Sequence, residues 1–318
     1  MIRKILLCRP DRLGDVVLTL PAAAALRERF PDAEITFLCS EKVAPVLEGH
    51  GSLDRVIKIR QGTSSVDLAR ALKKERFDAS LHFFVEPVTA LAAFRAGIPR
   101  RVGPFSKVWS LFLNERLRQS RSKCRKNEAD YNLDIAAPLG AAADPRPAGL
   151  YLTREEKERA RLFLDERGLR RKPAICIHPG GALRAKRWPV EKFALLAGRL
   201  SRAGAGVVVT AGPDDGDVLN GFSGNGCAVW SGNDLRFLMS LINECGYFVS
   251  NSTGPLHVAS GLGVPSCSFF WSRKACSSVR WGPYPPSAKN IIFETSDEKF
   301  SDITADSAFD ALSEKIGL

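Results

Sequence analysis

The sequence lacks any run of about 18 apolar residues, and its first ten residues carry charges at positions 3, 4 and 9. A membrane-spanning helix needs about 20 apolar residues, and a signal peptide needs an uncharged apolar core. We therefore expect neither feature. Any membrane contact would be peripheral.

Paired cysteines and clustered histidines are also absent. The eight cysteines are scattered and form no CxxC pair, and the four histidines show no metal-ligand spacing. Such a pattern is typical of reduced thiols in a cytoplasmic protein, so we expect no disulfide framework and no metal site. His50 is expected at the surface, whereas His82, inside an apolar strand, could face a cleft.

Three nucleotide-binding and catalytic signatures are missing as well: the GxGxxG loop, the Walker loop and the nucleophile elbow. The first predicted strand runs into RPDRLGDVV, where Gly14 is the only glycine. This loop does not favour a dinucleotide-dependent dehydrogenase.

What the sequence does have is an ordinary globular composition with an excess of positive charge. It contains 318 residues, 45% of them apolar, and 46 Lys and Arg against 35 Asp and Glu, a net charge of +11. Residues 1–151 carry 25 basic and 17 acidic residues (+8), which leaves 21 and 18 (+3) for the remainder. The excess predicts an anionic substrate or partner.

Short apolar runs alternate with amphipathic stretches along the whole chain, which predicts an α/β protein with parallel sheets. The expected strands are 4–8, 34–39, 55–59, 78–85, 174–178, 206–211, 247–250 and 266–271, and the expected helices are 15–29, 41–48, 65–76, 87–96, 153–167, 233–244 and one after Pro189. The segment 140–150 reads as a linker. We therefore expect two Rossmann-like domains, 1–148 and 149–318, facing each other across a cleft.

Asp15 follows the first strand, at the sheet edge where α/β proteins bind ligands. It is either a residue of the functional site or only a cap of the next helix, and its position alone does not favour one over the other.

Two loops of the second half could bind an anion. In SNSTGPLHV, from residue 250, Thr253 can cap a helix and Gly254 lets backbone amides approach a phosphate. In HPGGALRAKRWP, from residue 178, Gly180 and Gly181 allow a close loop and Lys186 adds charge. An ordinary capped connection and a solvated basic loop are the competing interpretations.

Two further features of this half could serve a nucleotide. His257 either supports the anion-binding loop or is structural. Asp215, in AGPDDGD after another strand, could bind a ribose or simply face solvent.

Four segments in this order resemble the ADP-heptose:lipopolysaccharide heptosyltransferases, glycosyltransferase family nine, which have the two-domain GT-B fold: RPDRLGDVVLTLPA (9–22), HPGGALRAKRWPVEKF (178–193), SNSTGPLHVASGLGVP (250–265) and RWGPY (280–284). The resemblance implies inverting transfer of heptose from ADP-heptose to the anionic inner core of lipopolysaccharide, with no cofactor and no obligatory metal. It implies that Asp15 is the general base, that Lys186 contacts the donor phosphates, and that Thr253, Gly254 and His257 cradle the diphosphate. Gly180, Gly181, Asp215 and Ser252 complete the expected donor site.

The chain departs from the family pattern at two places. The family loop is usually Asn-Asp-Thr/Ser-Gly, whereas Ser252 stands here at the acidic position, and Arg273 and Lys274 appear where the family commonly has Phe-Gly-Pro-Thr-Asp. These changes agree with a nucleotide-diphosphate site but leave the donor sugar open, so another nucleotide sugar or an epimerase stays an alternative. A nucleic-acid-binding protein would explain the charge, but no recognition motif is present.

The basic stretch between Pro99 and Lys126 holds nine cations and one acid, Glu115. It either binds an anionic lipid-linked acceptor at the cytoplasmic face of the inner membrane or is a solvated loop. The residues expected to contact the acceptor are Arg12, Arg118, Arg121, Lys123 and Arg125.

Overall fold

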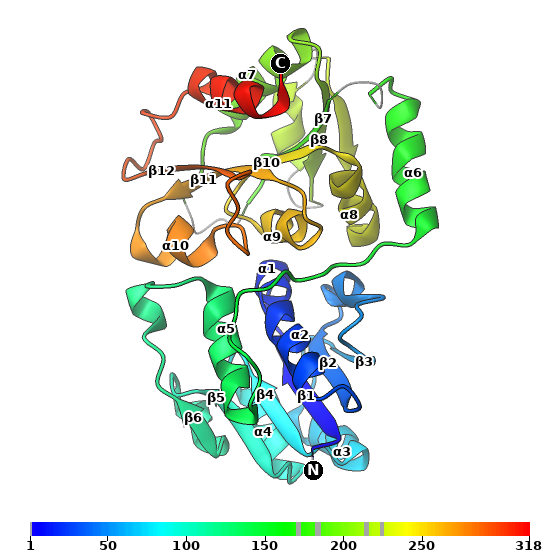
Figure 1. Ribbon diagram of the computed structural model, residues 1–318, viewed down its shortest axis with the longest axis vertical. Coiled ribbons are helices and arrows are strands. Elements are labelled where there is room, and N and C mark those ends of the chain that lie inside the picture. The colour runs from blue at the N-terminus through cyan, green and yellow to red at the C-terminus, as the bar shows by residue number, and fades with distance from the viewer. Residues whose placement is uncertain (1, 170–172, 182–185, 213–215, 223–225) are drawn as a thin grey trace. The chain divides into compact units, whose positions relative to one another are not determined.

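The computed structural model describes residues 2–169, 173–181, 186–212, 216–222 and 226–318 (Figure 1). The chain divides into two compact units, Met1–Tyr151 and Leu152–Leu318. The division lies three residues beyond the domain boundary expected after residue 148.

The first unit is built on a parallel sheet in the order β3-β2-β1-β4-β5-β6. Its strands are β1 (Lys4–Cys8), β2 (Glu34–Ser40), β3 (Arg55–Ile59), β4 (Ala79–His82), β5 (Arg100–Pro104) and β6 (Glu115–Leu117). Its helices are α1 (Leu13–Val17), α2 (Leu20–Arg29), α3 (Ser65–Glu75), α4 (Pro87–Arg95) and α5 (Glu128–Ala136), with 3-10 turns η1 (Ala44–Leu47), η2 (Val108–Phe112), η3 (Arg121–Lys123) and η4 (Ala137–Leu139). Parallel neighbours require crossovers, which these helices and turns provide.

The second unit repeats this plan with a sheet in the order β12-β11-β10-β7-β8-β9. Its strands are β7 (Ala174–His178), β8 (Gly206–Ala211), β9 (Ala228–Ser231), β10 (Tyr247–Asn251), β11 (Ser266–Trp271) and β12 (Ile291–Thr295). Its helices are α6 (Arg154–Asp165), α7 (Val190–Arg202), α8 (Leu235–Glu244), α9 (Gly254–Gly261), α10 (Ser278–Trp281) and α11 (Ala305–Ile316), with 3-10 turns η5 (Gly216–Phe222) and η6 (Lys274–Cys276).

Numbered within each unit, both sheets have the strand order 3-2-1-4-5-6. The α/β prediction with two Rossmann-like units is therefore confirmed. In this topology the chain reverses its direction of travel across the sheet between the first and fourth strands, and ligands bind at the carboxyl ends of the strands there. That point lies between β1 and β4 in the first unit and between β7 and β10 in the second.

Continuous apolar runs form the central strands because both faces of each sheet are covered. All six residues of β8 are buried, and Trp188 stacks on Phe269 with ring centroids 4.0 Å apart. Helix starts are set by side-chain caps such as Ser64 before α3 and the capping box of Thr153 and Glu156 at α6. The cores hold the strand ends, and hence the loops that follow them, in place.

Three expectations about elements need correction. The helix expected over 15–29 is two helices, α1 and α2, with Pro21 in the first turn of α2, and the helix expected over 41–48 is only the short turn η1. The basic stretch, which gave no regular pattern, contains β5 and β6. Arg100 and Glu115 on these strands form an ion pair at 2.6 Å, so charged residues here belong to a sheet edge.

Candidate functional site

Asp15 lies in α1, directly beyond the carboxyl end of β1. Its carboxylate is buried and accepts a hydrogen bond from Nη2 of Arg9. The N-cap of α1 is Arg12, without a side-chain capping bond, so Asp15 is not the helix cap. Burial raises the pKa of Asp15 to about 6, while the charge of Arg9 opposes the rise and those of Asp11 and Glu128 add to it.

Arg9 is itself buried, and it ties Asp15 to the rest of the unit. Its Nε donates to Asp11 at 2.7 Å, and its Nη1 donates to the carbonyl of Phe83 at 3.2 Å and to Glu128 at 3.3 Å. Glu128, fully buried at the start of α5, also accepts from Nη1 of Arg121 at 2.6 Å. Asp15 is therefore held by a polar network that joins β1, β4 and α5.

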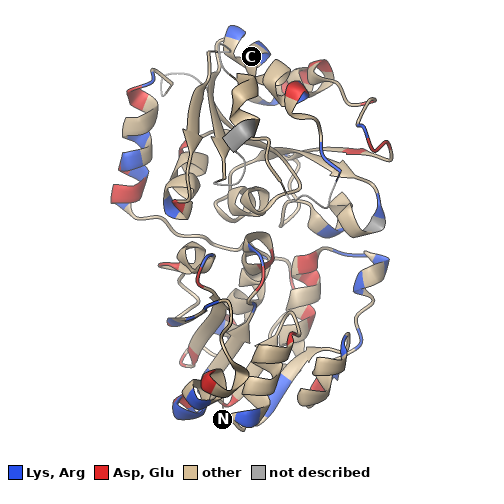
Figure 2. Cartoon of the chain, turned by 180° about the vertical axis from the view of Figure 1, so that it is seen from behind, with Lys and Arg blue, Asp and Glu red and all other residues tan. Residues whose placement is uncertain are grey.

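Arg121 thus differs from the other four cations expected to bind an acceptor. It is largely buried against Glu128 and Phe83, whereas the remaining four are exposed and make no ion pair among the described residues: Arg12, Arg118, Lys123 and Arg125. Figure 2 shows Lys and Arg along the segment between β6 and α5. The exposed members are free to meet an anion.

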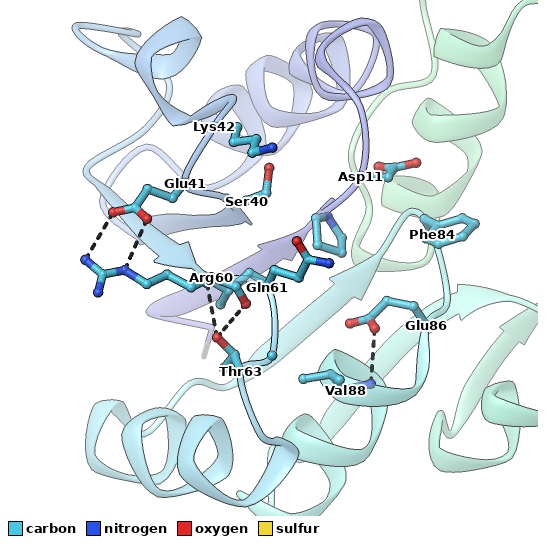
Figure 3. Close-up of a pocket in the computed structure, with 13 residues that line it drawn as sticks. Asp11, Ser40, Glu41, Lys42, Arg60, Gln61, Thr63, Phe84, Glu86 and Val88 are labelled. Carbon is cyan, nitrogen blue, oxygen red and sulfur yellow. Dashed lines mark hydrogen bonds and ion pairs between the residues drawn. The ribbon is translucent and has the colours of Figure 1, made fainter. Parts of the chain in front are cut away.

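A pocket of about 720 Å³ opens beside Asp11, at the carboxyl ends of the strands of the first unit (Figure 3). Its polar lining includes Asp11, Glu41, Lys42, Gln61 and Glu86. The Glu86 carboxylate accepts the amide of Thr89 at 2.8 Å and so caps α4, whereas Lys42 is exposed and has no ion pair among the described residues.

The sequence analysis did not find this pocket, because its lining consists of ordinary polar and apolar residues from the segments that follow β1, β2, β3 and β4. The rule that ligands bind at carboxyl strand ends, applied after β2 and β3, could have found it.

In the second unit, the two predicted anion-binding loops come together. Asn251, at the end of β10, accepts the amide of Trp188 at 2.8 Å and donates to the carbonyl of Pro179 at 3.2 Å. A Cβ added at Gly181 would lie 3.2 Å from Cγ2 of Thr253. Glycine at this position therefore allows the loop after β7 to lie against the loop after β10.

Thr253 is the N-cap residue of α9, but its side chain makes no capping bond. Its Oγ1 is buried and lacks a hydrogen-bond partner among the residues that the structure describes. A buried hydroxyl without a partner is costly, and here it lies at a helix N-terminus, where backbone amides and the helix dipole favour an anion. Gly254 begins α9, and Ser252 precedes the cap half-buried.

The other predicted donor residues lie in varied surroundings. Lys186 forms an ion pair with Glu298 at 2.8 Å, and both side chains are about half exposed. His257 is buried in α9, with its ring 6.4 Å from that of Trp281. Gly180 directly follows the Pro179 carbonyl that Asn251 binds. Asp215 lies outside the described residues.

The three remaining histidines are buried. His50, expected at the surface, is buried, and its Nε2 lies 2.6 Å from the carbonyl of Ala148. His82 is buried in β4 beside Ser80, and burial lowers its pKa to about 3. His178 lies 3.0 Å from Oγ1 of Thr210, and burial lowers its pKa to about 4. Burial also lowers the pKa of His50, so all three imidazoles are neutral at pH 7.

Two kinds of site are absent from the described residues. They contain no group of three or more His, Cys, Asp or Glu arranged to hold a metal ion, and none of their helices is long and apolar enough to cross a membrane.

Comparison with known proteins gives consistent matches. The model of glycosyltransferase family 9 (heptosyltransferase) matches residues 65–306. A Haemophilus influenzae protein with a provisional glycosyltransferase name is 30% identical over 308 residues, 91% of this chain and 88% of that protein.

Two solved structures from E. coli have the same fold. ADP-heptose lipopolysaccharide heptosyltransferase II superposes with a TM-score of 0.84 at 23% identity, covering 98% of each chain. Heptosyltransferase WaaC with ADP superposes with a TM-score of 0.76 at 18% identity, covering 98% of this chain and 99% of that one.

Proposed function

The chain belongs to glycosyltransferase family 9 and has the GT-B fold, and from this premise we propose that it transfers heptose from ADP-heptose to the inner core of lipopolysaccharide, with Asp15 as the general base. Membership of this family favours a transferase over the epimerase and the nucleic-acid-binding alternatives. The proposed donor and acceptor are those in the name of the similar E. coli enzyme, ADP-heptose lipopolysaccharide heptosyltransferase II.

The observation that carries the proposal is that Asp15 is buried at the end of β1 and has a raised pKa. A general base works best when its pKa lies near the working pH, and burial brings the pKa of Asp15 to about 6, close to but below neutrality. The acceptor hydroxyl oxygen would attack the anomeric carbon as the bond from that carbon to the diphosphate oxygen breaks. The hydroxyl proton would pass to Asp15, and the nucleoside diphosphate would leave with the bonding electrons. Inversion at the anomeric carbon follows from a single displacement.

The donor would bind to the second unit at the start of α9. Three groups would stabilise the diphosphate as negative charge develops on it: Oγ1 of Thr253, which has no partner among the described residues, the amide of Gly254 and the helix dipole. Gly180 and Gly181 would allow the diphosphate to approach the loop closely, and His257, which is buried in α9, would support the loop. Lys186 would exchange Glu298 for a phosphate, and Asp215 would bind the ribose.

The acceptor would bind to the first unit. The pocket beside Asp11 follows the same strand as Asp15, and Lys42 adds a positive charge to it. Arg12, Arg118, Lys123 and Arg125 would contact acidic groups of the core, while Arg121 would act by holding Glu128. Because this acceptor is linked to lipid, the protein would work at the cytoplasmic face of the inner membrane.

Asp15→Asn tests the proposal. The amide keeps the shape and loses the base, so kcat should fall by 10²–10⁴, while the Kd for ADP, measured by calorimetry, should stay within about twofold because Asp15 belongs to the other unit. Asp67→Asn, on the exposed face of α3, is the matched control. A variant with the parental turnover would exclude Asp15 as the base.

A second donor remains a candidate because Ser252 stands where the family has an acid. Single-turnover assays with ADP-heptose and a panel of other nucleotide sugars, using core-truncated lipopolysaccharide as acceptor, separate the two. Transfer from another donor at a higher kcat/KM than from ADP-heptose would move the proposal to that sugar.

A further inference from the structure

The first unit carries an exposed apolar patch formed by the end of α4 and the segment 105–111. Its five members and their exposed fractions are Phe94 (50%), Phe105 (50%), Val108 (66%), Trp109 (38%) and Leu111 (65%). We refer to these residues as the 94–111 patch. Single exposed apolar residues are normal, but a group of this kind marks a surface that binds a partner or a membrane.

Two members of the patch, Phe94 and Trp109, make aromatic contacts with the same neighbour, Phe112. The Phe112 ring lies 5.5 Å from that of Phe94 and 6.4 Å from that of Trp109, measured between centroids. These contacts join η2 to the end of α4. Val108 and Leu111 are consequently displayed on a defined turn.

Cations surround the patch. Arg101 lies over the Phe94 ring at 5.4 Å and Arg116 over the Phe105 ring at 5.5 Å, and Lys107 lies within the segment itself. Glu115 is the one acid between residues 96 and 126, and it is paired with Arg100. The patch therefore combines apolar side chains with an almost uncompensated positive field.

We propose that the 94–111 patch docks onto an anionic lipid bilayer, with Val108, Trp109 and Leu111 entering the headgroup region. Aromatic and aliphatic side chains bordered by Lys and Arg are what binds an anionic interface: the apolar atoms leave water and the cations meet the headgroups. A second copy of the chain fits less well, since a two-fold contact would place the same cations against each other. The inference extends the membrane location given above and does not depend on the transfer reaction.

The test is flotation of the full-length protein with vesicles of phosphatidylcholine, with and without phosphatidylglycerol. The variant Val108→Ser/Leu111→Ser removes the two most exposed members, and Leu195→Ser, 61% exposed on α7 of the second unit, is the matched control. We expect wild type and Leu195→Ser to bind the anionic vesicles equally, and the double variant to bind at least tenfold more weakly. All three proteins should bind vesicles of pure phosphatidylcholine weakly.

Insertion can be seen directly, because Trp109 is the only tryptophan of the first unit. Anionic vesicles with brominated acyl chains should quench part of the wild-type fluorescence, and Trp109→Phe should lose that quenching. This measurement is made on the wild-type protein, so it does not depend on whether a variant with polar substitutions folds normally.

Three results would overturn the proposal: wild type that does not float with anionic vesicles, a double variant that floats equally well, or a dimer in analytical ultracentrifugation that the double variant dissociates. Transfer to a delipidated core oligosaccharide, measured in parallel, keeps the two inferences apart. A protein that docks without transferring would overturn the proposed reaction alone, and one that transfers without docking would overturn this inference alone.

Discussion

Asp15 is subject to two opposing influences, and their balance sets the pH at which it can accept a proton. Burial favours the neutral acid, while Arg9 favours the carboxylate. Because its pKa in the folded protein lies near 6, a protonated Asp15 accumulates as the pH falls below that value. If Asp15 is the base, as proposed, the activity should be present above pH 6 and lost below it.

We expect kcat/KM to fall about tenfold per pH unit below pH 6. Asp11→Asn should move this acid limb to lower pH, because the negative charge of Asp11 raises the pKa of Asp15. Without that charge, Arg9 would also interact more strongly with the Asp15 carboxylate, since it now pairs with both acids. Rate profiles of wild type and both Asp11→Asn and Asp67→Asn test this. An acid limb that stays in place or moves upward in Asp11→Asn would show that another group titrates.

Thr253 makes a different kind of prediction, because its buried hydroxyl lacks a partner among the described residues. In Thr253→Val the methyl group replaces an unsatisfied oxygen at nearly constant volume, so the unliganded variant should unfold at the same temperature or higher. The same change should weaken ADP binding about tenfold if the hydroxyl meets the diphosphate. Thermal unfolding with and without ADP measures both; a lower Tm with unchanged ADP affinity would make Thr253 purely structural.

At the scale of elements, α5 matters because its first residue closes the network around Asp15. Glu128 accepts from both Arg9 and Arg121 and is fully buried. Glu128→Gln removes a charge that both guanidinium groups contact, and breaking a buried ion pair of this kind costs about 3–5 kcal/mol. For a unit of this size the Tm should fall by roughly 6–20 °C.

Asp67→Asn again supplies the control, since it breaks an exposed ion pair with Arg70, one helical turn away on α3. Exposed pairs of this type contribute little, so its Tm should change by no more than about 2 °C. Equal shifts in the two variants would show that the buried network does not hold α5 on the sheet.

The sequence analysis predicted correctly that Asp15, Gly181 and Thr253 follow strands, because apolar strands and the loops after them are local patterns. The functional roles of these three residues stay predictions. It did not separate Arg121 from Arg125, which look alike in the chain. Arg121 contacts Glu128, seven residues away, and the carbonyl of Phe83, the residue directly after β4. Such pairing depends on packing that no local pattern records.

The strands β5 and β6 were missed for a related reason. Arg100, Arg101 and Glu115 break the apolar pattern, yet these charges pair with each other or with backbone carbonyls, such as that of Phe112, at the edge of the sheet. Charged side chains on an edge strand discourage pairing with the strands of other chains. The same charges that made the strand hard to predict therefore also prevent aggregation at this edge.

At the scale of the whole molecule, the net charge of +11 is concentrated in the first unit. Long-range attraction of an anionic acceptor depends on exposed charges, and Arg118, Lys123 and Arg125 are exposed without ion pairs among the described residues. Neutralising these three residues together to Ser should raise the KM for lipid-linked acceptor at least tenfold, at about 1 kcal/mol per cation near an anionic surface. The KM for the donor, which would bind the second unit, should not change.

A triple variant of Arg70, Lys73 and Lys74, exposed on α3, lowers the net charge by the same amount at another place and serves as the control. High salt should raise the acceptor KM of the wild-type protein, as the first triple substitution does. The reason is that the screening length falls from about 10 Å at 0.1 M salt to about 3 Å at 1 M. If the position of the cations matters, only the triple variant between β6 and α5 should have a raised acceptor KM at low salt. High salt should then remove the difference in acceptor KM between this variant and the wild-type protein. If the two triple variants raise it equally, the overall charge attracts the acceptor and these three residues make no particular contact with it.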